Sequence, residues 1–384
     1  MDELVELTHD LVSIPSHEGE TAAGDYIEEW LRAETDADVT RDGVGNVIAR
    51  RATDSPAASE GVGAPGEGSE SASPDADREG SSTSLALVGH HDVVPPAASQ
   101  VEDGEYVVEG RDGRLYGRGT ADMKGSVVAS MLAFRDANPA CELVFASFVG
   151  EELGGNGVRH AIGHGFSPDY AIVAEGSTNY SKQGVTDVVV AHRGRRASTL
   201  TASGTAAHAS EPDAGKNAIY RACDAVGIVR DCEVPTVSVL GHDISGSVVV
   251  TEIDGGSAWN VIPDTCEVTV DERTVPGEHA DLGSVEEVEG VEWTVEQDLP
   301  PMECDDAEFA ETVLAAARDA QDGDPEHVTK PHATDAGWLA QAGTTCVVCG
   351  ASEPGEAHTK DESVSVDVLR RCYRIYRNAA ERVS

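Results

Sequence analysis

The chain has 384 residues, enough for two or three domains or for one large core with an insertion, and 40% of the residues are hydrophobic. Aspartate and glutamate number 70 against 27 lysines and arginines, so the formal net charge is −43. This balance excludes the classes of protein that bind nucleic acid or an anionic membrane through a basic surface.

The acidic excess, together with a shortage of lysine, predicts a protein adapted to high salt. Self-repulsion of this size destabilises a compact chain in dilute buffer. Salt at about 1 M screens it, because the Debye length falls to about 3 Å. The composition is similar to that of proteins from salt-accumulating halophilic microbes. Lysine occurs at only five positions: Lys124, Lys182, Lys216, Lys330 and Lys360.

The sequence predicts a cytoplasmic protein with reduced thiols. Its first residues are acidic and no apolar run approaches 18 residues, so we expect neither a secretory signal nor a transmembrane helix. The eight cysteines are scattered and indicate buried thiols rather than a disulfide framework. The single Cys-x-x-Cys, at Cys346 and Cys349, lies in an apolar run, and we interpret it as a core strand rather than a zinc or redox site.

Strands that alternate with helices in the first half of the chain predict an α/β fold with a largely parallel sheet. Helices are predicted over residues 2–12, 20–34, 121–138 and 154–165. Strands are predicted over residues 46–50, 85–90, 142–149 and 169–174. Residues 52–84 have almost no large apolar side chain, so we expect a disordered surface loop there.

A different pattern begins at about residue 185 and predicts an inserted α+β domain of βαββαβ-like order. Alternating strands flank a helix at residues 216–230. Further strands are predicted over residues 247–253, 266–275 and 291–297, the last at an edge. The chain then returns to the first domain with a strand at 344–349 and helices over residues 305–320, 335–342 and 361–382.

Histidines and carboxylates gather where the predicted strands end, which is where ligands bind in a parallel sheet. His90 and Asp92 lie two residues apart, so on an extended chain they face the same way and Asp92 can orient a metal-ligating His90. Further clusters contain Asp122, the adjacent pair Glu151 and Glu152, Glu175, and His358. Histidine and carboxylate without thiolate suit a hydrolytic two-metal site.

Two of these clusters admit other interpretations. Gly117 and Gly119 form a Gly-x-Gly, but Asp122 places a charge where a dinucleotide's pyrophosphate would lie, so we reject a dinucleotide loop. Glu151 and Glu152 could be a solvated acidic turn. A metal cation explains them better, because one carboxylate can coordinate it while the other handles a proton.

The order of these clusters resembles the M20 metallopeptidases, the family of acetylornithine deacetylases and succinyl-diaminopimelate desuccinylases. The resemblance covers nearly the whole chain except residues 52–84. It extends to further segments: Leu11-Val-Ser-Ile-Pro-Ser16, Gly204-Thr-Ala-Ala-His208, Pro212-Asp-Ala-Gly-Lys-Asn-Ala218, Gly255-Gly-Ser-Ala-Trp-Asn260-Val-Ile-Pro263, Asp271-Glu-Arg273 and Thr334-Asp335-Ala336.

The resemblance implies a zinc-peptidase-like catalytic domain, residues 1–184 and 300–384, with a mixed, largely parallel sheet flanked by helices. It also implies an inserted ferredoxin-like lid and dimerisation domain at residues 185–299. The cofactor would be two divalent ions, zinc first and cobalt or manganese as alternatives, and the protein would be a homodimer.

The resemblance also implies a role for each residue of the clusters. His90 and Glu175 would hold one ion, Glu152 and His358 the other, and Asp122 would bridge both. Glu151 would be the general base for a metal-bridging water, and Asp92 would orient His90. His208, usually supplied by the partner subunit in this family, would be a catalytic residue that polarises the scissile carbonyl. Asn260 and Arg273 would contact the substrate, Arg273 at its α-carboxylate.

The implied activity is hydrolysis of the C–N bond of a linear amide. The substrate would be an N-acetyl or N-succinyl amino acid such as N-acetylornithine or N-succinyl-diaminopimelate. A di- or tripeptidase, a carboxypeptidase, or a silent metal-binding dimer scaffold are the alternatives. Arg193, Arg195 and Arg196 could bind a second carboxylate of a succinyl chain, or could equally form a solvated strand edge.

Overall fold

A nine-stranded mixed sheet organises the larger part of the chain in the computed structural model, which describes residues 2–52 and 83–384. The strand order is β1 (Asp38–Arg41), β2 (Val47–Arg51), β8 (Glu142–Phe148), β3 (Ser84–His90), β9 (Tyr170–Val173), β21 (Thr345–Val348), β10 (Val188–His192) and β19 (Met302–Glu303), with β20 (His327–Lys330) paired to β10. The consecutive strands β8, β3, β9 and β21 are parallel, so their carboxyl ends meet at one edge.

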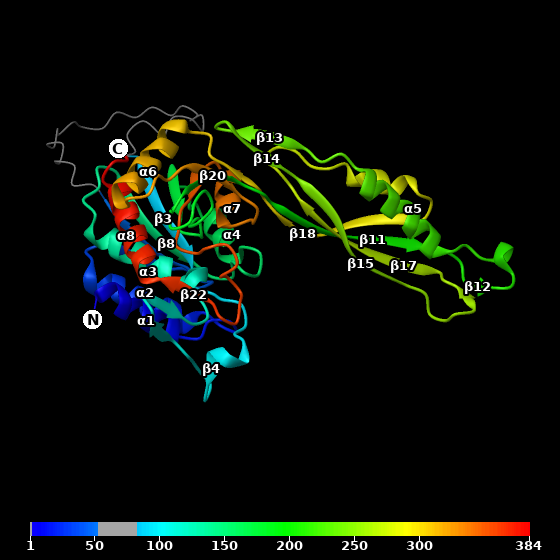
Figure 1. Cartoon of the computed structure of the whole chain (residues 1–384), viewed down its shortest axis with the longest axis horizontal. Coiled ribbons are helices and arrows are strands. Elements are labelled where there is room, and N and C mark those ends of the chain that lie inside the picture. The colour runs from blue at the N-terminus through cyan, green and yellow to red at the C-terminus, as the bar shows by residue number, and fades with distance from the viewer. Residues whose placement is uncertain (1, 53–82) are drawn as a thin grey trace, which may run out of the picture.

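Helices cover both faces of this sheet (Figure 1). One face carries α1 (Glu3–Ser13), α2 (Thr21–Glu34), α3 (Gly125–Asp136), α6 (Ala307–Ala320) and α8 (Val366–Ala380). The other carries α4 (Asn156–Gly163) and α7 (Asp335–Gln341). Strand β3 shows why two layers form, since Leu85 and Leu87 enter the first core while Ala86 and Val88 enter the second. The predicted α/β class is confirmed.

The predicted helices differ from the observed ones mainly at their first residues. The helix expected over 361–382 begins at Val366, because Ser363–Ser365 forms strand β22. This strand pairs with β7 (Arg114–Tyr116), whose other neighbour is β6 (Glu109–Arg111). The helix expected over 121–138 begins at Gly125, after the short turn η2 (Thr120–Lys124). The loop predicted at 52–84 falls almost wholly on residues 53–82, which lie outside the described residues.

The chain leaves the large sheet later than the predicted boundary after residue 184. Strand β10 pairs in parallel with β20 and antiparallel with β21, so it belongs to the large sheet. Its side chains from Val188 to His192 are all buried. A continuously apolar strand of this kind is typical of a sheet covered on both faces, whereas the strands that follow alternate.

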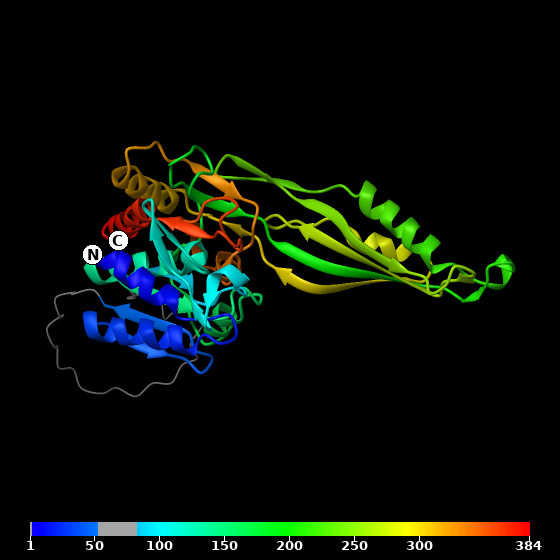
Figure 2. The same cartoon turned by 60° about the horizontal axis from the view of Figure 1, so that its bottom comes forward.

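Residues 195–299 contain a separate four-stranded antiparallel sheet that projects from the large one (Figures 1 and 2). Its order is β15 (Ser247–Gly255), β17 (Thr265–Arg273), β11 (Arg195–Ser203) and β18 (Val291–Leu299). Helix α5 (Ala218–Asp231) and the short helix η4 (Leu282–Glu287) pack on it through one apolar core. Along the chain these elements follow the order β11, α5, β15, β17, η4, β18.

Small strand pairs complete the described structure. The hairpin β13 (Thr236–Val239) and β14 (His242–Ser245) lies between α5 and β15 in the chain. The pair β12 (Ala207–His208) and β16 (Val261–Ile262) forms the far tip of the projecting sheet (Figure 1). Strands β4 (Val101–Glu102) and β5 (Glu105–Tyr106) form another hairpin.

The cysteines agree with an expectation from the sequence. All eight cysteines are free, and Cys346 and Cys349 are fully buried on and just after β21, as expected for a core strand. No helix in residues 2–52 and 83–384 combines the length and apolar character that a membrane span requires.

Candidate metal centre

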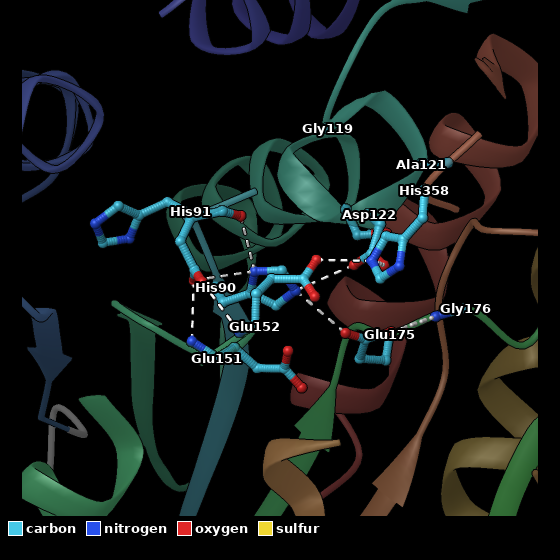
Figure 3. A network of polar contacts seen from close by, with 12 residues as sticks. His90, His91, Gly119, Ala121, Asp122, Glu151, Glu152, Glu175, Gly176 and His358 are labelled. Carbon is cyan, nitrogen blue, oxygen red and sulfur yellow. Dashed lines mark hydrogen bonds and ion pairs between the residues drawn. The ribbon is translucent and has the colours of Figure 1, made fainter. Parts of the chain in front are cut away.

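Five histidine and carboxylate side chains converge at the carboxyl ends of the parallel strands (Figure 3). His90 is the last residue of β3, Glu152 follows β8, and Glu175 follows β9. Asp122 lies in η2 just before α3, and its own backbone is extended rather than helical. His358 lies in the loop after β21 and has a positive φ of 64°. Parallel pairing brings together residues that are far apart in the sequence.

Asp122 stands between two histidines, one facing each of its oxygens. His90 Nε2 lies 3.1 Å from Asp122 Oδ1 and 3.3 Å from Glu175 Oε1. His358 Nε2 lies 3.3 Å from Asp122 Oδ2 and 2.9 Å from Glu152 Oε1. The donor atoms therefore form two groups, His90–Asp122–Glu175 and Asp122–Glu152–His358, each with all atoms within 4.8 Å of one another.

Asp92 links the end of β3 to the turn after β8. Its Oδ1 lies 3.3 Å from His90 Nδ1, on the side of the ring away from Asp122. The two oxygens accept the backbone N–H groups of Glu151 at 3.1 Å and Glu152 at 3.0 Å. Burial raises the pKa of Asp92, but the bonds from His90 and the two N–H groups lower it by more, so the carboxyl is held ionised. One carboxylate thus orients His90 and fixes the turn.

The two adjacent glutamates have different surroundings. Glu152 pairs with His358, whereas the side chain of Glu151 belongs to neither group. Burial raises the pKa of Glu151 well above its usual range; His90 opposes this, while Asp335 and the other carboxylates add to it. Hydrogen bonds to Asp122 and Glu152 raise the pKa of His358 to about 10. The centre is therefore short of positive charge, which a bound cation would supply.

A second buried carboxylate fixes the backbone that presents Asp122. Glu362 Oε1 accepts N–H groups from Gly119, Ala121 and Asp122 at 2.9, 3.1 and 3.2 Å. Its Oε2 receives Arg118 Nη1 at 2.5 Å, and both side chains are almost fully buried. Glu362 could not be assigned this role from the sequence, because its partners lie some 240 positions earlier in the chain.

Lys330 is a further residue near the centre for which the sequence alone indicated no role. Lys330 ends β20, is 6% exposed, and places Nζ 3.3 Å from Glu175 Oε2. Burial lowers its pKa, but Glu175 and neighbouring groups raise it by more, so the lysine is charged. The scarcity of lysine in this chain was the one signal that could have drawn attention to it.

A cavity of about 290 Å³ opens beside the two groups. Its wall includes Tyr180, Lys330, His332 and Glu353 in addition to the carboxylates. Burial, Lys330 and Arg273 lower the pKa of His332, so Arg273 is near this wall. Arg273 also pairs with Asp271, at 2.7 Å between Nε and Oδ1. The cavity gives a small molecule access to the centre.

Two predicted site residues lie far from this centre within the same chain. His208, in β12, and Asn260, just before β16, are both exposed at the tip of the projecting sheet (Figure 1). There Ala209 N–H donates to Asn260 O at 2.9 Å. The fold brings them together with each other but not with Asp122. His91 also lies apart: it points away from the groups and contacts Ser147 Oγ at 2.8 Å (Figure 3).

Ion pairs account for two of the three clustered arginines. Arg195 Nε lies 2.8 Å from Asp271 Oδ2, and Arg196 Nη1 lies 3.4 Å from Glu272 Oε2. These are cross-strand pairs on β11, an inner strand between β17 and β18, so the expected strand edge is wrong. The pairs favour a structural role for these two arginines over a binding site for a second carboxylate.

The donor set fits zinc in a hydrolytic role. Imidazole nitrogen and carboxylate oxygen are both ordinary zinc ligands, and three protein ligands leave a position open for water or substrate. Each of the two groups offers one histidine and two carboxylates, with Asp122 common to both. The arrangement can therefore hold two divalent ions side by side.

Comparison with known proteins adds independent findings. The model of peptidase family M20/M25/M40 matches residues 86–382. An acetylornithine deacetylase of Myxococcus xanthus is 30% identical over 311 residues, which cover 75% of this chain and 77% of that protein. A succinyl-diaminopimelate desuccinylase of Stenotrophomonas maltophilia is 28% identical over 327 residues, covering 78% and 84%. The crystal structure of aminopeptidase PepT from Bacillus cereus superposes with a TM-score of 0.75 at 19% identity over 98% of each chain.

Proposed function

Because the chain belongs to peptidase family M20/M25/M40, we propose that it is a dinuclear metal-dependent amidohydrolase that removes an N-acyl group from an amino acid. The acyl group is acetyl or succinyl, as on N-acetylornithine or N-succinyl-diaminopimelate. One observation carries the proposal: the two oxygens of Asp122 face two histidines, and the same nitrogen of each histidine also contacts a glutamate of its own. The names of the two sequence relatives support the choice of substrate class.

The residues around Asp122 fit two divalent ions, zinc first. His90 and Glu175 would hold one ion, Glu152 and His358 the other, and Asp122 both. When bound, such ions lower the pKa of water and stabilise the oxyanion of the reacting amide. Asp92 would keep the Nε2 of His90 directed at the first ion, because its Oδ1 lies 3.3 Å from the opposite ring nitrogen.

Glu151 is the candidate for moving protons. Its side chain is outside both ligand groups, while its backbone N–H is fixed by Asp92. A carboxylate whose pKa is raised by burial can accept a proton from the attacking water and return it to the leaving amine. This division assigns Glu152 to metal binding and Glu151 to proton transfer.

We also propose a homodimer in which a partner subunit completes the substrate site. His208 and Asn260 are far from their own metal centre, so they could contact substrate only in another copy. The edge strand β15 exposes Val249 and Ile253, each by 54%, and nearby Trp259 is 99% exposed. An unpaired edge with apolar side chains is an ordinary dimer contact. Arg273, near the cavity wall, is the candidate partner for the substrate's α-carboxylate.

A panel of substrates tests the proposal. The holoenzyme, loaded with zinc or cobalt in molar KCl, is assayed on N-acetylornithine, N-succinyl-diaminopimelate, other N-acyl amino acids, and di- and tripeptides. We expect the highest kcat/KM on one acyl amino acid. Preference for peptides would assign the chain to the peptidases of its family. No hydrolysis at two bound ions would leave only a metal-binding scaffold.

A further inference from the structure

A buried lysine stands directly behind one of the metal-facing carboxylates. Lys330 Nζ lies 3.3 Å from Glu175 Oε2 and donates to the carbonyl of Gly176 at 3.0 Å. Its backbone is held at the end of β20, where Arg193 N–H donates to Lys330 O at 3.1 Å and β20 pairs with β10. The ammonium therefore sits on rigid structure rather than on a surface loop.

The two oxygens of Glu175 have different partners. Oε1 faces the centre, 3.3 Å from His90 Nε2. Oε2 faces away from it and receives Lys330 Nζ and, at 3.3 Å, the N–H of Gly176. A glutamate with both oxygens free can rotate about its last torsion, which has a broad preference. The lysine removes that freedom, so a single oxygen is presented to His90 and Asp122.

Stability alone does not explain a lysine at this place. Removing an ammonium from water is costly, and a buried ion pair is often no more stabilising than apolar residues of similar volume. Lysine is almost never fully buried without a partner. Of the five lysines in the chain, Lys330 is the one whose ammonium group forms a hydrogen bond with a metal-facing side chain in the described structure.

We propose that Lys330 is a positioning residue that orients Glu175 for the ion shared with His90 and Asp122. The inference rests on the proposed function, because it assigns Glu175 to metal binding. It concerns the affinity of that one ion, because the hydrogen bonds of the Lys330 ammonium in the described structure go to Glu175 and Gly176 and not to Glu152 or His358.

The direction in which metal affinity changes when Lys330 is removed distinguishes a positioning role from a purely electrostatic one. If Lys330 acted only as a nearby positive charge, its removal would strengthen the binding of a divalent cation, because like charges repel. If it orients Glu175, its removal weakens binding of one ion by about 10- to 100-fold, the usual effect of losing the partner of a metal ligand.

The test is a titration of the metal-free Lys330→Met variant with zinc or cobalt. Binding is measured by calorimetry and, for cobalt, by its visible absorption. Lys182→Met is the matched control, because Lys182 pairs with Glu326 on the surface, half exposed. Of the affinities for the two metal ions, we expect one to fall about 10- to 100-fold in Lys330→Met. The other affinity, and both in Lys182→Met, should match the wild type. Unchanged or tighter binding in Lys330→Met would overturn the inference.

Two further variants keep the result interpretable. Lys330→Gln retains a hydrogen-bond donor, so it should recover part of the affinity, and it replaces Lys330→Met if circular dichroism shows that the latter is unfolded. Glu175→Gln already disables the ligand, so adding Lys330→Met to it should cause little further loss; a full additional loss would contradict action through Glu175. A wild type that binds no ions would refute the proposed function, whereas normal binding by all Lys330 variants would refute this inference alone.

Discussion

Glu151 and Glu152 are neighbours in the sequence but should respond differently to the same substitution. Glu151→Gln removes a proton acceptor and almost no volume. The backbone N–H of Glu151 stays bonded to Asp92 at 3.1 Å, so the turn should keep its place. Because the side chain is outside both ligand groups, we expect two ions per chain, as in the wild type. Glu152→Gln should lose one ion, because Glu152 Oε1 lies 2.9 Å from His358.

The loss of rate follows from the number of proton transfers assigned to Glu151. A positioned general base contributes about 10²- to 10⁴-fold. In the proposed function Glu151 both accepts and returns the proton, so we expect the upper end, about 10⁴-fold in kcat, or about 5 kcal/mol at about 1.4 kcal/mol per tenfold. Metal content is measured by mass spectrometry after dialysis in molar KCl, and kcat on the best substrate of the panel.

Glu326→Gln is the control for this comparison, because Glu326 is half exposed in a surface pair with Lys182. It should keep both ions and full activity. The division of roles would be refuted if Glu151→Gln and Glu152→Gln lost metal equally, or if Glu151→Gln kept wild-type kcat.

Three other outcomes are expected. Glu362→Gln should destabilise the protein by about 3 kcal/mol, read as a lower Tm in thermal unfolding, because Arg118 would remain buried without its charged partner; an unchanged Tm would contradict the buried pair. Zinc binding near pH 8 should release a proton from His358, because the pKa of His358 in the metal-free protein is raised to about 10, and zinc affinity should therefore rise with pH. Calorimetry in buffers of different ionisation enthalpy measures the proton release. No release would contradict the pairing of His358 with Asp122 and Glu152. Dialysis from molar to about 0.05 M KCl should first dissociate the dimer and then unfold the protein, because the net charge of −43 is screened less in dilute salt. Sedimentation and activity are measured against KCl concentration. An active dimer in dilute buffer would refute the adaptation to salt.

The parallel strands and the clusters that follow them could be predicted because each is a local pattern. A short apolar run ended by His90, by the Glu151–Glu152 pair or by Glu175 carries both the strand and the chemistry in about ten residues. The rule that such strand ends share one edge then brings the clusters together.

Contacts over long sequence separations could not be predicted in this way. Lys330 and Glu175 are 155 positions apart, and Glu362 and Asp122 are 240 apart. Neither Lys330 nor Glu362 stands in a pattern that specifies its partner. The boundary at 184 differed from the structure for a related reason: the apolar run of β10 is compatible with either sheet, and only its pairing with β20 and β21 decides between them.

The sharing of one carboxylate by two ions is the central claim, and the metal content of Asp122→Ala tests it most directly. The wild type and the variant are loaded with zinc, dialysed in molar KCl, and analysed for zinc per chain by mass spectrometry. Because Asp122 Oδ1 faces His90 and Oδ2 faces His358, we predict two ions in the wild type and a loss at both positions in the variant. A variant that keeps one ion at full occupancy, or a wild type with a single ion, would contradict the claim.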